Sequence, residues 1–310
     1  MTARPILAIA LNPTIDMSQD AERVQPTLKI RTRNQQFYPG GGGTNVARVI
    51  AELGGDAELV FLSGGATGPV FENLIAGLPI RRHAFPMAGA VRISDTLFEE
   101  ATGFEYRAVP EGPEVSEAEL EPVFDLLRRF SGGYVVASGS LPRGIGSDAY
   151  ARMGRIAAEN DCRFVLDTSG EALRETVGKV PLHLFKPSIG ELESLVGNRL
   201  LPGEAEEAAM DLAAAGKAEI ITVTMGRDGA FMARRDGVVH EPPIHVRTRS
   251  AVGAGDSFVG AMVMKLAGGA DVRDAFLYGL AAGAAAAMTP GTVLCRRADV
   301  DMLYARQPER

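Results

Sequence analysis

The sequence has little of several residue types on which common classes of protein depend. Its 310 residues include two cysteines, Cys162 and Cys295, and no tryptophan. Two cysteines so far apart give neither a disulfide framework nor the paired spacing of a zinc site. A reducing compartment fits this scarcity, and we expect a cytoplasmic protein.

Histidine is also scarce, with four residues scattered along the chain. No HExxH motif occurs, and no Ser–His or Cys–His constellation is visible. We therefore interpret His83, His183, His240 and His245 as surface or loop residues. The chemistry would then rest on carboxylates, lysines and backbone amides.

Positive charge is in deficit, because 32 lysines and arginines face 39 acidic residues and give a net charge of −7. Such a balance argues against nucleic acid or an anionic membrane as the main partner. No apolar run approaches the roughly 20 residues of a membrane helix. The apolar part of RPILAIALNP (4–13) is too short for a secretory signal and is typical of a first buried strand.

Short β-rich runs alternate with helical segments, which predicts an α/β fold with a mostly parallel sheet. Strands are expected at 6–11, 57–64, 133–141, 163–169 and 219–226, and a helix at 44–53. Ligands bind beyond the carboxyl ends of strands in such sheets. The candidate site positions are therefore Asn12 to Asp16, Ser63 to Gly65, Ser138 to Ser140, Asp167 to Ser169 and Thr224 to Gly226.

Two segments break this pattern, at 29–38 and 91–109. Val91, Ile93 and Leu97 alternate with Arg92, Ser94 and Thr96, so that one face is apolar and the other polar. We expect a small sheet whose strands are inserted at about 17–38 and 88–110 into a single domain of 1–310. It would cover a site as a lid or offer its apolar face to a second subunit. A decorative hairpin is the alternative.

Four consecutive glycines, at 40–43, run into the helix expected from Thr44. Such a run costs conformational entropy and usually marks a place where backbone approaches a ligand, although a simple turn is the alternative. Neither the GxGxxG dinucleotide fingerprint with its acidic residue nor the GK[ST] of a Walker A motif is present here. Asn45 supplies both a donor and an acceptor, which suits a polyol better than a phosphate.

A second glycine-containing turn lies in SAVGAGDSFVGA (250–261). The start of a helix presents unpaired N–H groups and partial positive charge, and so favours an anion such as phosphate. Asp256 stands at this helix start. It is either a helix cap or a group that acts on the ligand bringing the phosphate.

Two further stretches carry weaker signals. In FKPSIGELESL (185–195), Lys186 ends a strand and Glu191 lies in the first turn of the next helix. A lysine near phosphates and a carboxylate that reaches Mg²⁺ through water are needs of phosphoryl transfer, although a Lys-Pro helix start is common. TMGRDGA (224–230) is typical of a tight turn between strands, and on its own indicates an ordinary hairpin.

Together these motifs resemble the ribokinase-like (PfkB) sugar kinases. GGGGTNVARVIAELGG and SAVGAGDSFVGA are similar to the two signatures of that family. ASGSLP (137–142), DTSGEAL (167–173), KPSIGE (186–191) and TMGRDGA match it in order and spacing, and with GTVLC (291–295) they bring the chain nearest to the phosphofructokinase branch. The resemblance spans nearly the whole chain. It implies a three-layer αβα sandwich with a mostly parallel central sheet and a small β-sheet lid that doubles as a dimer clasp.

In this family the carboxylate after Gly-Ala-Gly is the general base. The resemblance implies that Asp256 takes the proton of a sugar hydroxyl as that hydroxyl attacks the γ-phosphate of ATP. The N–H groups of Gly253, Ala254, Gly255 and Asp256 would form an anion hole for the transferring group. The sugar is expected between Asp16, the Gly41–Gly42 turn and Asn45.

The resemblance also implies a phosphate already on the sugar, and that phosphate needs cations. Arg92 is the first candidate because a guanidinium fork matches a phosphate, and Lys29 and Arg31 are the further cations. Ser140, which ends the strand in ASGSLP, is another candidate for contact with the sugar phosphate. Lys29 is similar to a family lysine that reaches the site of the neighbouring subunit, which implies a homodimer clasped by the inserted strands. A solvated basic face is the alternative for these cations.

ATP would lie over TMGRDGA. The residues implied near it are Thr224, Gly226, Gly229 and Thr248, with Lys186 and Glu191 serving its phosphates and Mg²⁺. The Ala/Gly-rich segment 279–287 offers a flat surface to adenine, although such helices also serve packing alone. The loop with Ser250, Val252, Thr289 and Gly291 is similar to a loop that binds a monovalent cation, K⁺, in relatives.

One segment departs from the family pattern. The family usually has Asn-x-x-Glu where this chain has Ser188-Ile189-Gly190-Glu191. Serine can still hold a water on the metal, so catalysis is expected to survive. Relatives carry a basic residue where Gly190 stands, associated with inhibition by a second MgATP, and its absence puts that regulation in doubt.

The implied activity is ATP-dependent phosphorylation of fructose 6-phosphate at its 1-hydroxyl. A tagatose 6-phosphate kinase or a 1-phosphofructokinase would use the same fold and catalytic residues. A non-catalytic sugar-phosphate sensor on this fold is the alternative from another class. An intact Asp256 with its anion hole argues against the sensor.

Overall fold

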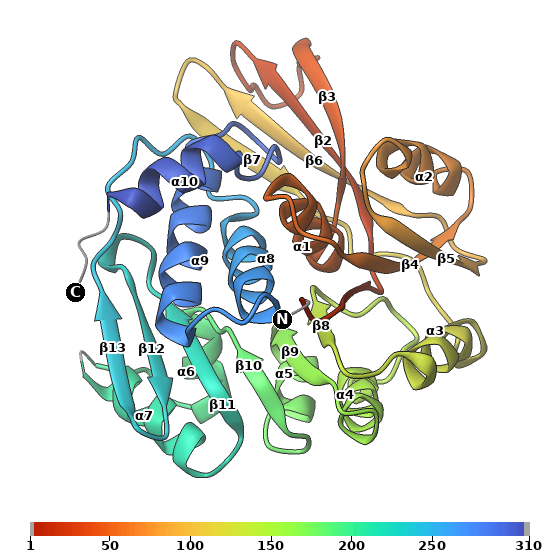
Figure 1. Cartoon of the computed structure of the whole chain (residues 1–310). Coiled ribbons are helices and arrows are strands. Elements are labelled where there is room, and N and C mark those ends of the chain that lie inside the picture. Colours follow the sequence, from red (N-terminus) through yellow and green to blue (C-terminus); the bar gives the residue numbers. More distant parts are fainter. Residues whose placement is uncertain (1–2, 202, 307–310) are drawn as a thin grey trace.

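The computed structural model describes residues 3–201 and 203–306, and its main feature is a sheet covered by helices on both faces (Figure 1). Nine strands follow one another in the order β13-β12-β11-β10-β9-β8-β1-β4-β5. Their bounds are β1 Ile6–Ala10, β4 Glu58–Gly64, β5 Arg81–Met87, β8 Tyr134–Ser138, β9 Arg163–Asp167, β10 Leu182–Phe185, β11 Ala218–Thr224, β12 Ala230–Arg234 and β13 Gly237–Glu241. The strands from β11 to β5 in this order run parallel to one another. β12 runs antiparallel to both of its neighbours, β11 and β13.

The central strands are apolar along their whole length. β1 and β8 are buried at every residue. A strand covered on both faces has no solvent side, so its sequence is a continuous apolar run rather than an alternation. The expected strands at 6–11, 57–64, 133–141, 163–169 and 219–226 are confirmed, with ends that differ by one to three residues.

Helices form the two outer layers. Their bounds are α1 Gly42–Glu52, α2 Gly68–Ala76, α3 Glu117–Arg129, α4 Ala149–Glu159, α5 Gly170–Thr176, α6 Ile189–Val196, α7 Glu204–Ala214, α8 Ala254–Ala267, α9 Val272–Ala287 and α10 Arg297–Ala305. In Figure 1, α1, α8, α9 and α10 lie over the near face of the sheet and α3 to α7 lie on its other face. The sandwich has therefore three layers, as expected.

Small residues let α8 and α9 lie side by side. A Cβ on Gly279 would come 3.0 Å from the carbonyl oxygen of Phe258, and one on Gly283 would come 3.2 Å from that of Ala254. Most of the Ala/Gly-rich segment 279–287 is thus used for packing against α8. Gly283, Ala284 and Ala287 keep partial exposure.

A second sheet of four strands projects from the main body (Figure 1). Its order is β3-β2-β6-β7, with bounds β2 Thr14–Ala21, β3 Thr32–Gly40, β6 Arg92–Glu99 and β7 Phe104–Ala108. Both unusual segments of the sequence contribute to it. Strand pairing starts at Thr14, three residues before the start that we expected for the first insertion.

The second sheet has an apolar face that is exposed and a polar face that is buried. Directly paired residues share a face, so Phe37, Ile93, Phe104 and Tyr106 lie on one side. All four are exposed, between 42% and 63%. The polar Ser94 and Thr96 on the opposite side are 6% and 5% exposed. The polar face therefore turns inward and the apolar face turns outward.

The expectation for histidine was wrong at one position. His183 lies on β10 and is buried, with Nδ1 2.8 Å from Oε2 of Glu219 and its ring against Tyr134. Its pairing with the carboxylate of Glu219 on the neighbouring strand β11 gives it a structural role. Among the residues that the structure describes, no helix is long and apolar enough to cross a membrane.

Candidate functional site

The predicted site residues gather where the parallel strands end. Asn12 follows β1, Ser140 follows β8, Lys186 follows β10, and Thr224 is the last residue of β11. These strands are neighbours or near neighbours in the sheet, with β9 and its last residue Asp167 between them. The carboxyl edge of the sheet is the usual ligand side of an open α/β fold.

The glycine run turns the chain sharply against the ends of β1 and β8. A Cβ on Gly43 would lie 2.1 Å from the carbonyl oxygen of Ile9, and one on Gly42 would lie 2.3 Å from Oγ of Ser138. A Cβ on Gly40 would lie 2.0 Å from a carboxylate oxygen of Asp16. These glycines are thus required by close contact with the protein itself, and that contact places the start of α1 beside Asp16.

Asp256 lies in the first turn of α8, where Gly253 caps the helix in a left-handed conformation with φ 72°. Its Oδ2 accepts a hydrogen bond from Nδ2 of Asn45 at 2.9 Å, although the two residues are 211 positions apart in sequence. The first N–H groups of a helix have no partner within it. Of the four N–H groups expected to form the anion hole, the N–H group of Ala254 contacts the carbonyl oxygen of Ala251 at 3.4 Å.

Burial raises the pKa of Asp256 to about 6, and the nearby charge of Asp167 acts in the same direction. The hydrogen bond from Asn45 and the charge of Lys186 oppose this rise. A carboxylate with a pKa close to neutral can both accept and release a proton at physiological pH. Asp256 is therefore suited to act as a general base.

Lys186 and Asp167 form a buried ion pair beside this carboxylate. Nζ of Lys186 is 3.1 Å from Oδ1 of Asp167, and both residues come from neighbouring strand ends. Burial acts to lower the pKa of Lys186, but the charges of Asp167, Glu191 and Asp256 outweigh burial and raise it. The lysine therefore stays cationic. It lies next to the start of α8, because a Cβ on Gly255 would be 3.3 Å from its Nζ.

Asp16 is a second buried carboxylate of the site. Burial raises its pKa to about 6, while the charges of Arg48, Arg92 and Arg107 act to lower it. By strand pairing, Asp16, Arg92 and Arg107 are distributed over the inward face of the second sheet. One acidic group surrounded by three arginines is an arrangement that attracts an anion bearing hydroxyl groups.

Arg92 is held by backbone carbonyl groups. It donates from Nη1 to the oxygen of Pro110 at 2.7 Å and from Nη2 to that of Asn12 at 3.1 Å. Nδ2 of Asn12 donates in turn to Oγ of Ser140 at 3.1 Å. Buried atoms without a partner among the described residues include Nε of Arg92, Oδ1 of Asn12 and Oγ of Ser138. Arg92 and Ser140 are thus linked through Asn12.

The nucleotide-side residues meet at the start of α6. Thr224 pairs with Ser188 in an isolated bridge, and its N–H donates to the oxygen of Pro187 at 3.2 Å. Gly226 and Gly229 follow, in the short connection between β11 and β12. That connection is a hairpin, as TMGRDGA on its own indicated.

Glu191 caps its own helix. Its Oε2 accepts from the N–H of Ser188 at 2.7 Å, and its N–H donates to Oγ of Ser188 at 3.3 Å, which is a capping box. Within 3–201 and 203–306, no three or more acidic, histidine or cysteine side chains form a metal cage. A divalent ion here would take most of its ligands from a nucleotide and water, as Mg²⁺ commonly does.

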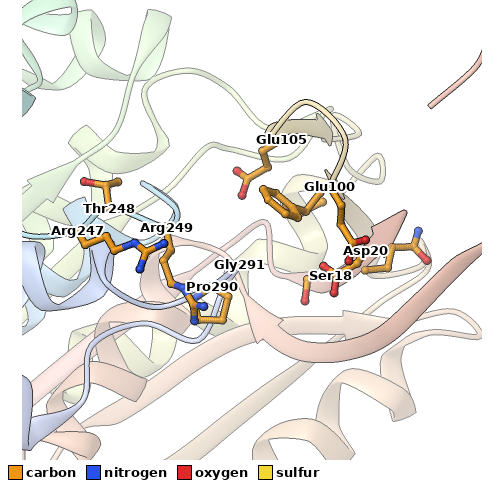
Figure 2. Close-up of a pocket in the computed structure, with 13 residues that line it drawn as sticks. Ser18, Asp20, Glu100, Glu105, Arg247, Thr248, Arg249, Pro290 and Gly291 are labelled. Atoms are coloured by element: carbon orange, nitrogen blue, oxygen red, sulfur yellow. The ribbon is translucent and has the colours of Figure 1, made fainter. Parts of the chain in front are cut away.

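Thr248 lies apart from the buried carboxylates, on the wall of a cavity of about 610 Å³. Figure 2 shows Arg247 and Arg249 on the same side as Thr248, facing Asp20, Glu100 and Glu105 of the second sheet across the gap. The residues lining this cavity do not include Asp16 or Asp256. It adjoins the site rather than containing it.

Like Thr248, Lys29 is a predicted residue that the chain does not bring to the buried carboxylates. It is exposed, in the connection between β2 and β3, as is Arg31. Conversely, sequence reasoning named Asp167 only as a candidate site position, without a role, and did not name Arg48 or Arg107. Asp167 was recognisable as a polar strand end, and Arg48 as a charged residue three positions after Asn45 on the same helix face.

We expect Asp256→Asn to stabilise the protein in a pH-dependent way. Because the pKa of Asp256 is raised to about 6, the folded state binds its proton more tightly than the unfolded state does. Stability is then lost as pH rises from about 4 to about 6 and stays reduced above that. The carboxyl group is buried but the residue as a whole keeps some exposure to solvent, which screens its charge, so the variant should gain about 1–2 kcal/mol at pH 8 and nothing at pH 4.

Urea unfolding across this pH range measures the effect. The exposed Asp148→Asn is the matched control and should leave the free energy of unfolding unchanged at both ends. An equal gain for Asp256→Asn at pH 4 and pH 8 would contradict the explanation.

Comparison with known proteins agrees with this geometry. The model of the "pfkB family carbohydrate kinase" matches residues 5–299. The chain is 39% identical to ATP-dependent 6-phosphofructokinase isozyme 2 of Mycobacterium tuberculosis, over 96% of this chain and 88% of that protein. It is 30% identical to a 1-phosphofructokinase of Borreliella burgdorferi, over 97% of both.

Solved structures give the same result. The crystal structure of phosphofructokinase-2 from Escherichia coli in complex with fructose-6-phosphate has a TM-score of 0.92 and 33% identity, and the match covers 98% of this chain and 99% of that one. The same Escherichia coli protein in complex with potassium has a TM-score of 0.93 at 34% identity, with equal coverage. With a carboxylate at a helix start, a buried lysine and the match over nearly its whole length, the chain belongs to the pfkB family of carbohydrate kinases.

Proposed function

We propose that this kinase transfers the γ-phosphate of ATP to the 1-hydroxyl of fructose 6-phosphate, giving fructose 1,6-bisphosphate. The observation that carries the proposal is Asp256, a base with a pKa of about 6 placed in the first turn of a helix. A base and an anion-binding helix start at one point are the two groups that phosphoryl transfer to an alcohol needs. The names of the relatives support the same acceptor.

In the proposed reaction Asp256 accepts the proton of the attacking hydroxyl. The hydroxyl oxygen forms a bond to the γ-phosphorus as the bond to the β–γ bridging oxygen breaks, and ADP leaves. The N–H groups from Gly253 to Asp256 stabilise the negative charge on the transferring group. Lys186, cationic and next to Gly255, adds a fixed positive charge on the nucleotide side.

The sugar would be held between the start of α1 and the second sheet. Asp16 accepts hydrogen bonds from its hydroxyls, and Asn45 lies beside the sugar while its amide holds Asp256. Arg92 and Arg107, on the inward face of the second sheet, provide the charge that a 6-phosphate requires. An acceptor without a phosphate would leave this charge unused.

The nucleotide would lie over Thr224, Gly226 and Gly229, with Thr248 close to it. Mg²⁺, when bound, would neutralise charge on the phosphate oxygens, and Glu191 is the carboxylate in position to hold it through water. We also propose K⁺ binding at the loop with Ser250 and Thr289. Its two segments are joined by the N–H of Arg249 donating to the oxygen of Ala287 at 2.8 Å.

A second copy of the chain would cover the apolar face of the second sheet. Phe37, Ile93, Phe104 and Tyr106 expose that face to solvent, and a patch of this kind is unusual for a lone subunit. Lys29 stands exposed at the end of the same sheet. A dimer clasped through these strands would carry Lys29 toward the site of the neighbouring subunit.

The first experiment compares kcat/KM of coupled ADP release with MgATP for fructose 6-phosphate, fructose 1-phosphate, tagatose 6-phosphate and fructose. We expect fructose 6-phosphate to be preferred. Arg92→Met should raise its KM about 10- to 100-fold, because a charge-assisted hydrogen bond contributes roughly 1.5–3 kcal/mol, and should hardly affect fructose. A preference for another sugar phosphate would leave the mechanism and change the acceptor. Turnover of fructose alone would contradict the role of Arg92.

Asp256→Asn separates a kinase from a sugar-phosphate sensor. Loss of the base should lower kcat by about 10²- to 10⁴-fold and leave the dissociation constant for the sugar phosphate within a few-fold. Single-turnover kinetics and calorimetry measure the two quantities. A sensor would show no phosphoryl transfer in either form and unchanged binding.

Phe37→Asp should produce monomers, since a charge on the apolar face opposes its burial against a second copy. Sedimentation velocity at micromolar concentration measures the change. Met210→Asp, an equally exposed apolar position on α7 at the other end of the molecule, is the control and should stay dimeric. A wild-type monomer, or a Phe37→Asp dimer, would be inconsistent with the clasp.

A further inference from the structure

We infer that Arg48 is a positioning residue for the phosphoryl transfer: it fixes the side-chain amide of Asn45 so that this amide holds the carboxylate of Asp256. The inference rests on the proposed function, because it assigns a task to a residue near the proposed base. It goes beyond that function by naming what aims the base.

The three side chains form a continuous chain of hydrogen bonds. Asn45 and Arg48 lie three residues apart on α1 and therefore on one face of that helix. Nη1 of Arg48 donates to Oδ1 of Asn45 at 3.1 Å, and Nδ2 of Asn45 donates to Oδ2 of Asp256 at 2.9 Å. The contacts thus run from the guanidinium through the amide to the carboxylate.

The chemistry of these groups permits one orientation of the amide. A guanidinium can only donate, and an ionised carboxylate can only accept. The oxygen of Asn45 must then face Arg48, and its NH₂ group must face Asp256. A rotated amide would place two donors together at one end and two acceptors at the other, so Arg48 excludes it.

Arg48 is itself held from three directions. Its Nη1 also donates to the carbonyl oxygen of Pro39 at 2.7 Å, its Nη2 lies 3.5 Å from that of Thr292, and its guanidinium lies 5.8 Å from the centre of the Tyr38 ring. Burial lowers its pKa to about 10, which leaves it charged at neutral pH. The guanidinium of Arg48 therefore connects the end of β3, the start of α1 and the loop before α10.

The consequence for catalysis lies in the second carboxylate oxygen of Asp256. With Oδ2 occupied by Asn45, the plane of the carboxylate is fixed and Oδ1 is left for the proton of the substrate. The charged groups Asp167, Lys186 and Asp16 also act on this carboxylate, but among the described residues the bond from Asn45 is the side-chain hydrogen bond that orients it. Loss of that bond would raise the pKa of Asp256 and free its side chain to rotate.

The test uses Arg48→Met and Arg48→Lys in the full-length protein. Arg48→Met should lower kcat for the preferred acceptor about 10- to 100-fold with little change in the KM for ATP, because a misplaced reacting group loses rate rather than nucleotide affinity. The acid limb of its kcat/KM profile should move to higher pH. Arg48→Lys should restore the acid limb but only part of kcat, since an ammonium keeps the charge without the fork.

Asn45→Ala shows whether Arg48 acts through the amide. In the Asn45→Ala background, Arg48→Met should change kcat less than two-fold further, because both substitutions break the same chain of contacts. Arg163→Met is the control for a lost arginine: Arg163 contacts the ring and hydroxyl of Tyr134 and should affect stability alone. Additive effects of Arg48→Met and Asn45→Ala, or an effect of Arg48→Met on stability alone, would overturn the inference.

A readout without turnover separates this inference from the proposed function. The side-chain amide signals of Asn45, assigned by their loss in Asn45→Ala, should follow the titration of Asp256 near pH 6 in the wild type and cease to do so in Arg48→Met. If no acceptor is phosphorylated but the amide signals follow the titration in the wild type and not in Arg48→Met, the proposed function is wrong and the contact from Arg48 through Asn45 to Asp256 is supported. Unchanged signals in Arg48→Met would overturn the inference whatever the activity.

Discussion

A carboxylate held away from water at the start of a helix requires support from the rest of this site. Burial works against the charge of Asp256, and the chain compensates with the amide of Asn45, the charge of Lys186 and the unpaired N–H groups of α8. None of these groups is close to Asp256 in sequence except the helix itself. The packing of α1 against α8 and the order of the strands therefore bring these supporting groups to Asp256, the proposed base.

The second sheet buries its polar face and exposes its apolar face, which is the reverse of the arrangement in a domain core. Its polar face, with Asp16, Ser94 and Thr96, is buried toward the main body, and its apolar face meets solvent. An apolar face in water and a buried polar face both cost free energy, so this arrangement is favourable only when each face binds a partner. In the proposed function, the inner face supplies the acidic and basic groups for a sugar phosphate, and the outer face packs against a second subunit. Substrate binding and assembly would then depend on the same four strands.

The departures of this chain from its family fall on the nucleotide side. Ser188 and Glu191 form a capping box, so the residues that replace the family pattern stabilise the start of α6. A Cβ on Gly190 would meet no atom within 4 Å, and no packing requirement explains the glycine. On the catalytic side, Asn45 contacts Asp256 and the charge of Arg92 acts on Asp16, whereas Lys29 is exposed in the connection between β2 and β3.

The sequence by itself determined the alternation of strands and helices, because short continuous apolar runs such as Ile6–Ala10, bounded by turn residues, are typical of strands covered on both faces. It also identified Asp256, Lys186 and the glycine run, whose local patterns carry their chemistry. Only the tertiary structure decided that Gly42 and Gly43 serve contact with the protein's own strands, that Asp167 pairs with Lys186, and that Arg48 reaches Asn45 and Pro39. Those facts depend on distances between residues remote in sequence, which no local pattern encodes.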